Sequence, residues 1–271
     1  MDLICPICEH RLTRQTGSYA CPENHSFDIA RQGYVNLLTV QQRHSAHPGD
    51  TREQVLSRRE FLEGGFYAPI AEALIAAAKE YDASGPVLDV GCGEGYYTAA
   101  ICEALTAAGK TPRTAGIDIS KEMVRRAAKR AKQAELAVAS AYRLPVADES
   151  IDLLLDCFSP LAIDEFRRVL KHGGHFLYVV PAEEHLWEMK QVLYDRPYRN
   201  ETKETPYEGF RYVTIRHEKS SITLSCQEDI QALFGMTPYC WKTPRAGKER
   251  LAALDTLTTT AAFDIHIFER I

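Results

Sequence analysis

Residues 86–105, PVLDVGCGEGYYTAAICEAL, constrain the fold more than any other stretch of the sequence. Val87 to Val90 form a short apolar run between Gly85-Pro86 and a cluster of glycines, as expected of a buried parallel strand. The glycines lead directly into a helical pattern, and such a turn brings the backbone close to a ligand at the start of a helix. The segment therefore predicts a ligand site at the carboxyl end of a strand.

The spacing of these glycines narrows the class of ligand. They follow a G-x-G-x-G pattern at Gly91, Gly93 and Gly95, and Tyr96 stands where a dinucleotide fingerprint requires Gly or Ala. A tighter loop without pyrophosphate contacts suits a ligand that has an adenosine and no phosphates. Asp89, before the glycines, can accept a hydrogen bond or face an ammonium group.

The following chain alternates between strand and helix patterns. Strands are predicted over 114–120, 136–141, 151–155 and 173–181, and a helix over 164–174. Asp118 ends the first of these strands, where its carboxylate can accept hydrogen bonds from both hydroxyls of a ribose. Alternating elements favour an α/β sheet with ligands at the carboxyl ends of its strands.

The first 25 residues contain a second, independent signal. Cys5, Cys8, Cys21 and His25 have C-x2-C-x12-C-x3-H spacing, which can place four ligands around one tetrahedral zinc ion. Four protein ligands leave no open position for water, so the zinc is predicted to be structural. His10 is the alternative fourth ligand, and His25 is preferred because it completes a symmetric pair with Cys21.

The segment between these two signals indicates how the chain divides. Residues 41–50 are poor in core residues and contain Pro48-Gly49, which is typical of an exposed connection. Helices are predicted from Arg52 and from Pro69 to Tyr81, with a break at Gly64-Gly65. We therefore expect a small domain over residues 1–40 and a larger one over 41–271.

Composition excludes some classes of protein. The net charge of −5 gives no long-range attraction to nucleic acid, so any polyanion must meet local patches. The sequence has no apolar run of about 18 residues and no signal peptide at its start, which predicts a cytoplasmic protein. In that compartment thiols stay reduced, which favours metal ligation over disulfides.

In this order the motifs resemble those of a known family. VLDVGCGEG, GIDIS, LPVADESIDLL and EFRRVLKHGGHFLYVVP are similar to motifs of the class I S-adenosylmethionine-dependent methyltransferases, over about residues 86–181. With CPICEHRL, CPENHSFDIARQGYVNLL and GDTREQVLSRREFLEGGFYAPI included, essentially the whole chain resembles the bacterial 23S rRNA guanine-N1-methyltransferases of the RlmA family.

The resemblance implies a Rossmann-like, mostly parallel seven-stranded sheet with one antiparallel strand in FDIHIFERI, beside a zinc module that helps bind an rRNA hairpin. It also implies S-adenosylmethionine as cofactor and makes a homodimer plausible. The predicted cofactor site consists of Asp89, Gly91, Gly93, Gly95, Tyr96, Asp118, Ile119 and Ala141, joined by Tyr67 and His185. For Tyr67 plain packing, and for His185 an exposed position at a helix start, are alternative interpretations.

The acceptor side is predicted in DCFSP, residues 156–160. Guanine N1 lies on the Watson-Crick edge, so a paired base must be extruded or supplied in a loop. Asp156 could orient the base or accept the N1 proton, Phe158 could stack on it, and Pro160 could shape the loop. Asp156 could equally cap its strand, and Cys157 is interpreted as a core cysteine because ring-nitrogen methylation needs no covalent nucleophile.

Two basic clusters are candidates for phosphate contacts. One lies in SKEMVRRAAKRAKQ, where a solvated helix face is the alternative, and the other surrounds Trp241 in WKTPRAGKER. Residues 194–216 are predicted to form a substrate-facing flap.

Two other functions remain open on sequence alone. The core motifs would equally suit a methyltransferase that acts on a small metabolite. A zinc-bearing RNA- or protein-binding factor that has lost catalysis is the second, although the intact glycines and acidic residues argue against it.

Overall fold

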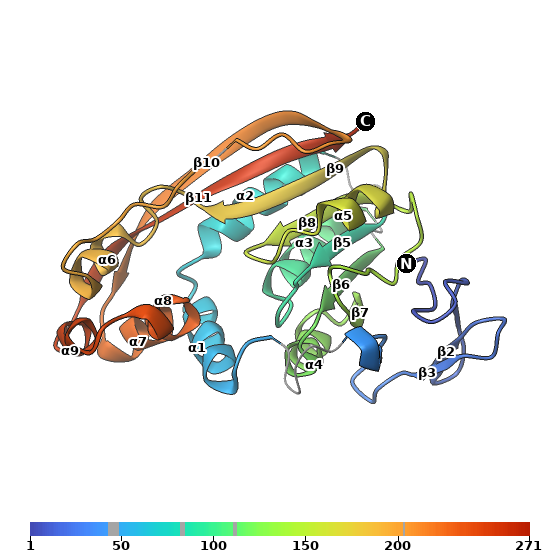
Figure 1. Cartoon of the computed structure of the whole chain (residues 1–271), viewed down its shortest axis with the longest axis horizontal. Coiled ribbons are helices and arrows are strands. Elements are labelled where there is room, and N and C mark those ends of the chain that lie inside the picture. Colours follow the sequence, from blue (N-terminus) through green and yellow to red (C-terminus); the bar gives the residue numbers. More distant parts are fainter. Residues whose placement is uncertain (43–48, 82–84, 111–112, 203) are drawn as a thin grey trace.

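The computed structural model describes residues 1–42, 49–81, 85–110, 113–202 and 204–271. Parts of the predicted connection over 41–50 and of the helix stop at 82–86 lie outside these residues. Figure 1 shows a large twisted sheet with a small N-terminal sheet at one end and a group of helices at the other.

The small sheet comprises three antiparallel strands in the order β1-β2-β3. Their bounds are Thr13–Arg14, Ser18–Ala20 and Ser26–Asp28. The large sheet has eight strands in the order β10-β11-β9-β8-β5-β6-β7-β4. In that order their bounds are Phe210–Leu224, Leu257–Arg270, Leu170–Pro181, Ile151–Cys157, Val87–Val90, Thr114–Asp118, Glu135–Val138 and Val35–Asn36.

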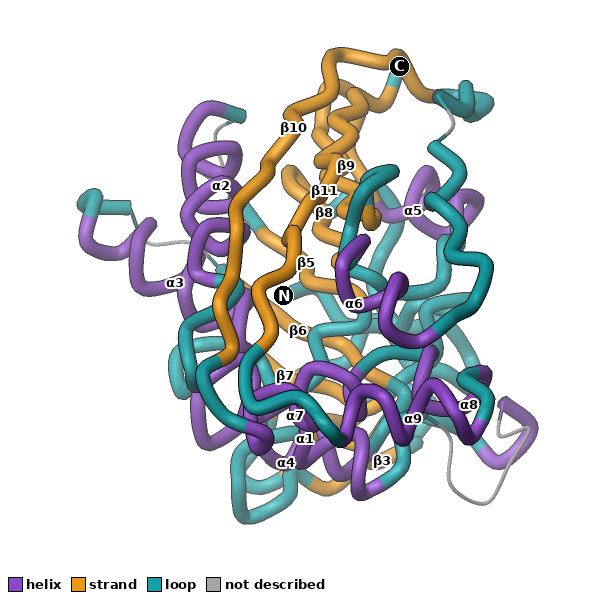
Figure 2. The backbone as a smooth tube through the Cα atoms, turned by 90° about the vertical axis from the view of Figure 1, so that its left-hand side faces the viewer, coloured by secondary structure: helices purple, strands orange, loops and turns teal. Residues whose placement is uncertain are grey.

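The described helices are α1 Arg52–Glu63, α2 Ala68–Glu80, α3 Tyr96–Ala107, α4 Lys121–Arg130, α5 Ile163–Val169, α6 Trp187–Leu193, α7 Gln227–Met236, α8 Tyr239–Lys242 and α9 Arg245–Ala252, with a 3-10 turn at Val40–Gln42. Figure 2 shows α2 and α3 on one face of the large sheet and α5 on the other. The predicted start at Arg52 and the break at Gly64-Gly65 are confirmed. Thr51 caps α1 reciprocally with Gln54, which fixes that start.

The predicted mostly parallel sheet is confirmed, with one difference. In the large sheet β11 runs antiparallel to both β9 and β10, while the other described neighbours pair in parallel. The eighth strand was not predicted, because β4 has two residues and its register depends on β7 (Val35 with Ala137, Asn36 with Val138). A pair this short carries no periodic signal in the sequence.

Two predicted boundaries are wrong. The helix predicted over 164–174 ends at Val169, and residues 170–174 belong to β9. A side chain at Gly174 would come within 2.9 Å of the Lys171 carbonyl oxygen, so this tight crossing needs glycine. The flap predicted over 194–216 ends at 209, because Phe210 to Arg216 pair with β11.

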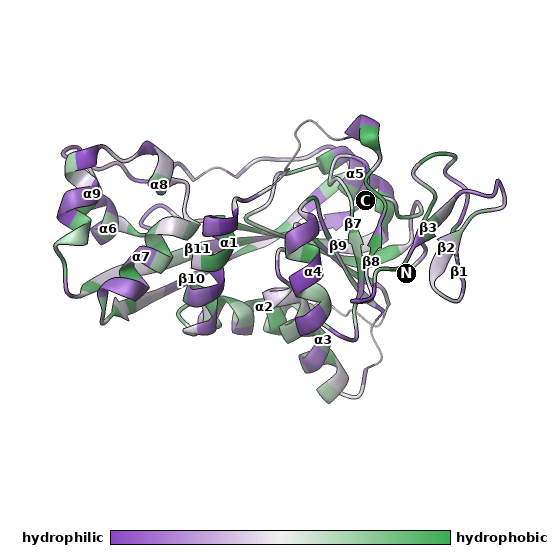
Figure 3. Ribbon diagram, turned by 90° about the horizontal axis from the view of Figure 1, so that it is seen from below, coloured by the Kyte–Doolittle hydropathy of each residue, from purple (hydrophilic) through white to green (hydrophobic). Residues whose placement is uncertain are grey.

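The core lies on both faces of the large sheet. One cluster joins α2, α3, α6 and α7 to the sheet. The cluster on the opposite face joins α5 to buried residues of the N-terminal module, namely Met1, Leu3, Cys5, Leu12, Tyr19 and Cys21. In Figure 3 the outer surface of α4 is hydrophilic, whereas the neighbouring strands are largely hydrophobic.

None of the described helices is by itself long and apolar enough to cross a membrane. The pair α1 and α2, bent by 79° at the break between them, reaches that length and composition together.

Candidate zinc and cofactor sites

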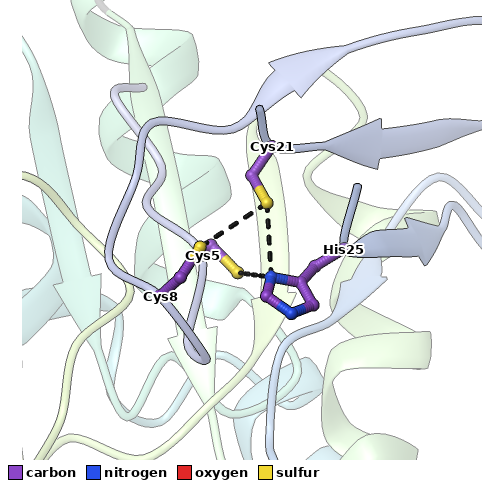
Figure 4. Close-up of side chains that lie close together, drawn as sticks. All are labelled: Cys5, Cys8, Cys21 and His25. Atoms are coloured by element: carbon purple, nitrogen blue, oxygen red, sulfur yellow. Dashed lines mark hydrogen bonds between the residues drawn. The ribbon is translucent and has the colours of Figure 1, made fainter. Parts of the chain in front are cut away.

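The four predicted metal ligands converge at the base of the small sheet (Figure 4). Cys5 Sγ and Cys21 Sγ lie 3.6 Å and 3.4 Å from His25 Nδ1, and Cys8 Sγ lies 3.6 Å from Cys21 Sγ. A tetrahedral zinc with bonds of about 2.0–2.3 Å places its ligand atoms at roughly these separations. The donor set and its spacing therefore fit zinc.

Two tight turns present these ligands. The amide of Glu9 donates to the Cys5 carbonyl and the amide of Asn24 to the Cys21 carbonyl, and both turn residues have positive φ. His10 is exposed and contributes its backbone carbonyl to the first turn. Among the described residues His10 is not part of the ligand group, so the preference for His25 is confirmed.

The glycine loop joins β5 to α3, as the sequence predicts. Gly91, Gly93 and Gly95 all have positive φ, between 55° and 78°. A side chain at Gly91 would lie 2.3 Å from Ser159 Oγ, whereas Gly93 faces open space. The loop therefore packs against the segment after β8 on one side and leaves room for a ligand on another.

Asp89 and Asp118 flank this loop. Asp89 is buried and accepts a hydrogen bond from Thr98 Oγ1, and burial raises its pKa to about 6. Asp118 accepts hydrogen bonds from the amides of Gly93 (2.9 Å) and Ser120 (2.7 Å). Asp118 thus fixes the glycine loop to the end of β6, and its carboxylate retains lone pairs for a ligand.

Asp156, at the end of β8, is fully buried. Its Oδ1 accepts a hydrogen bond from the Ser159 amide at 3.0 Å, and its Oδ2 has no hydrogen-bond partner in the described chain. Burial raises the pKa of Asp156 to about 8, although the Ser159 amide opposes this. A buried, half-satisfied carboxyl is expensive to keep, and such groups are characteristic of functional sites.

A cavity of about 430 Å³ lies over the glycine loop. Of the predicted site residues, its walls include Tyr67, Gly91, Gly93, Tyr96, Phe158 and His185. Asp89 and Asp156 lie beneath the surface, and Pro160 is exposed outside the cavity wall. Ile119 lines a neighbouring cavity of about 760 Å³ with Leu38 and Val138, and Ala141 is half-buried after β7.

Tyr67 and His185 are in contact in the wall of this cavity. Tyr67 Oη lies 3.3 Å from His185 Nε2, and the Ala262 amide donates to His185 Nδ1 at 3.3 Å. Burial lowers the pKa of His185 to about 3, so the ring is neutral and its proton lies on Nε2. His185 then donates to Tyr67, which leaves the Tyr67 hydroxyl proton available to a ligand.

The backbone of Phe158 is in a strained, left-handed conformation. Its φ of 60° is unusual for a bulky residue, and 42% of its surface is exposed. Its ring lies 5.4 Å from that of Phe263, which also contacts Tyr67 and His185. Backbone strain of this kind concentrates at ligand clamps.

Sequence reasoning missed the far wall of the cavity. Arg58 and Leu62 of α1, Tyr178 of β9 and the segment Met236 to Tyr239 all contribute to it. These residues come from elements distant in the sequence and belong to no recognisable motif. Burial raises the pKa of the Cys157 thiol well above its usual range, in keeping with a core cysteine.

The two basic clusters differ in the structure. On α4, Arg125 and Arg126 pair with Glu122, and Arg130 pairs with Glu63 and Glu94, which favours the interpretation as a solvated helix face. Trp241 is 65% exposed beside the exposed Lys242.

Comparisons with known proteins agree with this arrangement. Residues 3–46 match the family described as RlmA, N-terminal, a zinc ribbon, and residues 82–220 match a methyltransferase domain. The "Putative 23S rRNA (guanine-N(1)-)-methyltransferase YxjB" of Bacillus subtilis (strain 168) is 35% identical, over 97% of this chain and 95% of its own length.

A 23S rRNA (guanine(748)-N(1))-methyltransferase of Streptomyces fradiae is 36% identical, over 70% of this chain and 67% of its own. The crystal structure of the YcgJ protein from Bacillus subtilis shares the fold with a TM-score of 0.52, at 19% identity, and covers 74% of this chain and 97% of its own.

Proposed function

This chain belongs to the family of 23S rRNA (guanine-N1)-methyltransferases with an RlmA-type zinc ribbon, and from that premise we propose that it methylates N1 of a guanine in 23S rRNA. The methyl donor is S-adenosylmethionine, as in other methyltransferase domains. The observation that carries the proposal for the site is the buried Asp156, with one unpartnered oxygen beside the glycine loop.

We propose that the cofactor lies across the carboxyl ends of β5, β6 and β7. Gly91, Gly93 and Gly95 have no side chains and let the backbone come close to the cofactor. Asp118 accepts hydrogen bonds from the ribose hydroxyls, and Ile119 and Ala141 flank the adenine. Asp89 and Tyr96 support the loop near the amino-acid end, where the Tyr67 hydroxyl, polarised by His185, donates to the carboxylate. When bound, S-adenosylmethionine supplies an electrophilic methyl group on a sulfonium.

On the acceptor side, we propose that Asp156 receives the N1 proton of the guanine. A general base works best when its pKa lies near the operating pH, and the buried Asp156, with a pKa of about 8, meets that condition. Phe158 provides a ring on which the base can stack, and Pro160 shapes the exposed side of the loop. The neutral His185 and the reduced Cys157 take no part in the proton transfer.

The test is incubation of the protein with methyl-labelled S-adenosylmethionine and 23S rRNA from cells that lack the enzyme, followed by mass spectrometry of the nucleosides. Label in 1-methylguanosine from 23S rRNA, and not from tRNA, is expected. Label in small-molecule extracts alone would favour a metabolite methyltransferase. Cofactor binding without any turnover would favour an inactive zinc-bearing binding factor.

The role of Asp156 is tested by Asp156→Asn, with Asp164→Asn on the exposed surface of α5 as the control. General acid-base catalysis contributes about 10²–10⁴-fold, so a loss of that size is expected in Asp156→Asn alone. In the wild type, kcat/KM should rise with pH through about pH 8, where half of the Asp156 carboxyl is ionised, and level off only about one pH unit higher. A kcat/KM that does not change with pH would show that Asp156 is not the general base and only caps its strand.

The proposal also covers the substrate, the domains, the location and the oligomeric state. The substrate is a hairpin of 23S rRNA, since a loop can supply the Watson-Crick edge of a guanine without prior unpairing. Residues 1–40 form the zinc module that helps bind it, and residues 41–271 form the methyltransferase domain. The protein works in the cytoplasm, where it can associate as a homodimer.

A further inference from the structure

A further cavity, of about 700 Å³, adjoins the cofactor cavity. The two share a wall made of Tyr178, Val180 and Pro181 at the end of β9. The other described residues that line the cavity of about 700 Å³ are Tyr198, Arg199, Asn200, Glu201, Thr202, Thr205, Tyr207, His266 and Phe268. We call this cavity the aromatic cleft.

The rings of the aromatic cleft are supplied by three separate segments. Tyr178 comes from β9, His266 and Phe268 from β11, and Tyr198 and Tyr207 from the loop before β10. Ring centroids lie 6.2 Å apart for Tyr178 and His266 and 5.3 Å apart for Tyr207 and Phe268. Tyr198 is 50% exposed, so its ring is accessible to a ligand.

A buried lysine holds the loop side of the cleft in place. Lys190 of α6 has no exposed surface, and its Nζ donates to the Tyr198 carbonyl at 3.2 Å and to Asn200 Oδ1 at 2.6 Å. The same ammonium lies 4.8 Å from the Tyr198 ring centroid and 5.5 Å from that of Tyr239, which lines the cofactor cavity. Lys190 thus connects the walls of both cavities.

Asn200 ties this loop to the end of β9. Its amide donates to the Glu183 carbonyl at 3.0 Å, and its Nδ2 donates to the Ala182 carbonyl at 2.8 Å. Burial of a lysine without a carboxylate partner is unfavourable, and hydrogen bonds and rings offset this only in a fixed geometry. The loop wall is therefore preorganised.

The charges of the cleft favour a base over a phosphate. Arg199 is the single Lys or Arg among the described lining residues, and it pairs with Glu184 and lies 4.9 Å from the Trp187 ring centroid. The described lining residues are otherwise mostly aromatic rings and uncharged polar groups, and such rings match the faces of a nucleobase, which stack on aromatic side chains in single-stranded RNA.

We propose that the aromatic cleft binds the base of a nucleotide next to the methylated guanine, and that Lys190 is a positioning residue for its Tyr198 wall. This inference rests on the proposed function. We assign the cleft to a neighbouring nucleotide because it shares a wall with the cofactor cavity. When the target guanine occupies the cofactor cavity, the base of the next or the preceding nucleotide can reach the aromatic cleft. Enzymes that act on extruded bases commonly set sequence context through such flanking contacts.

The experiment uses the full chain and hairpin RNAs cut from the labelled region of 23S rRNA, with an abasic position before or after the target guanine. The variants are Tyr207→Ala and Lys190→Met, with Tyr207→Phe as the matched control that keeps the ring. Tyr142→Ala, a 66% exposed tyrosine between β7 and β8, is the distant control.

Loss of one stacked base is expected to lower kcat/KM of the wild type by about 5- to 150-fold on one of the two abasic hairpins. Tyr207→Ala should show a similar loss on intact RNA and little further loss on that hairpin. Lys190→Met should raise KM for RNA with little change in kcat or in cofactor affinity. Tyr207→Phe, which keeps the ring, should lose less activity than Tyr207→Ala, and Tyr142→Ala should behave as wild type.

Additive effects of Tyr207→Ala and the abasic position would overturn the proposal, as would wild-type kinetics in Tyr207→Ala. If Lys190→Met lowers thermal stability and cofactor affinity together, the positioning role of Lys190 is overturned. The Tyr207 variants alone then test whether the aromatic cleft binds a base. Methylation of the intact hairpin by the wild type tests the proposed function separately. If neither the hairpin nor 23S rRNA is methylated, the proposed function is overturned, and the proposal for the aromatic cleft, which rests on it, is overturned too.

Discussion

The zinc module (residues 1–40) and the helical lobe (α6, α7, α8 and α9) lie at opposite ends of the large sheet and reach stability by different means (Figure 1). The module has three very short strands and needs a metal to hold its turns. The lobe packs buried residues such as Leu193, Leu233 and Leu251 into the core that it shares with α2 and α3. One end depends on four ligand atoms and the other on buried apolar area.

The comparison also shows that the module is integrated into the methyltransferase domain. The connection from β7 to β8, residues 139–150, has no helix, although parallel strands are usually joined through one. Leu3 pairs with Val146, and Ile4 donates to the Pro145 carbonyl at 3.0 Å. The module thus packs along this crossover on the face of the sheet that α5 covers.

Zinc removal should have the largest effect. Structural zinc contributes about 10–16 kcal/mol of apparent binding free energy in zinc-finger peptides, so Cys21→Ser or chelation should unfold the module. Since β4 then leaves β7, affinity for S-adenosylmethionine should fall as well. Hydrogen exchange of residues 13–36 and calorimetry of cofactor binding measure the two effects. Cys226→Ser, outside the ligand group, is the control, and unchanged cofactor affinity would show that the module is independent.

Leu233→Ala should destabilise the lobe by about 2–5 kcal/mol, because Leu233 is fully buried and its loss leaves a cavity. Urea unfolding measures the free energy, and the zinc content should stay at that of the wild type. Leu56→Ala, 42% exposed on α1, should change the free energy of unfolding by less than about 0.5 kcal/mol. Loss of zinc from Leu233→Ala would mean that the two ends are not energetically separate.

Asp156→Asn should increase stability while it lowers activity by about 10²–10⁴-fold, since it removes a group whose buried charge is unfavourable from the region between the two ends. The pKa of Asp156 is raised on folding, so its protonated form stabilises the wild type below about pH 4, and this contribution is lost as pH rises towards about 8. The free energy of unfolding of Asp156→Asn, minus that of wild type, should therefore grow between these values by on the order of 1–3 kcal/mol. A difference that does not change with pH would contradict the burial of this charge.

The smallest effect on stability is expected for Trp241→Ala in the lobe and Ile7→Ala in the module, two exposed apolar residues. Each should change the free energy of unfolding by less than about 0.5 kcal/mol. If Trp241 stacks on RNA, its loss should weaken RNA binding by about 5-fold or more in a filter assay at fixed salt. Weakening by Ile7→Ala alone would assign the RNA contact to the zinc module instead.

Much of the fold could be predicted because its signals are local. The cysteine spacing selected all four ligands, and the glycines at 91, 93 and 95 predicted the turn between a strand and a helix. The strand at Val87 to Val90 was placed without error, since an apolar run between glycines has few alternatives. Cofactor and acceptor roles for these residues stay predictions until the experiments above are made.

Other features depend on partners that are distant in the sequence. Separate elements pack together to create three of these features: the unpartnered oxygen of Asp156, the contact between Tyr67 and His185, and the aromatic cleft. The sequence by itself determined the metal ligands, the glycine turn and the strand at Val87 to Val90, because ligand spacing and the residues that bound a strand are properties of neighbouring residues. Only the tertiary structure decided which side chains are buried, which proton His185 keeps and where Lys190 lies, because burial and hydrogen bonding are properties of the packed whole.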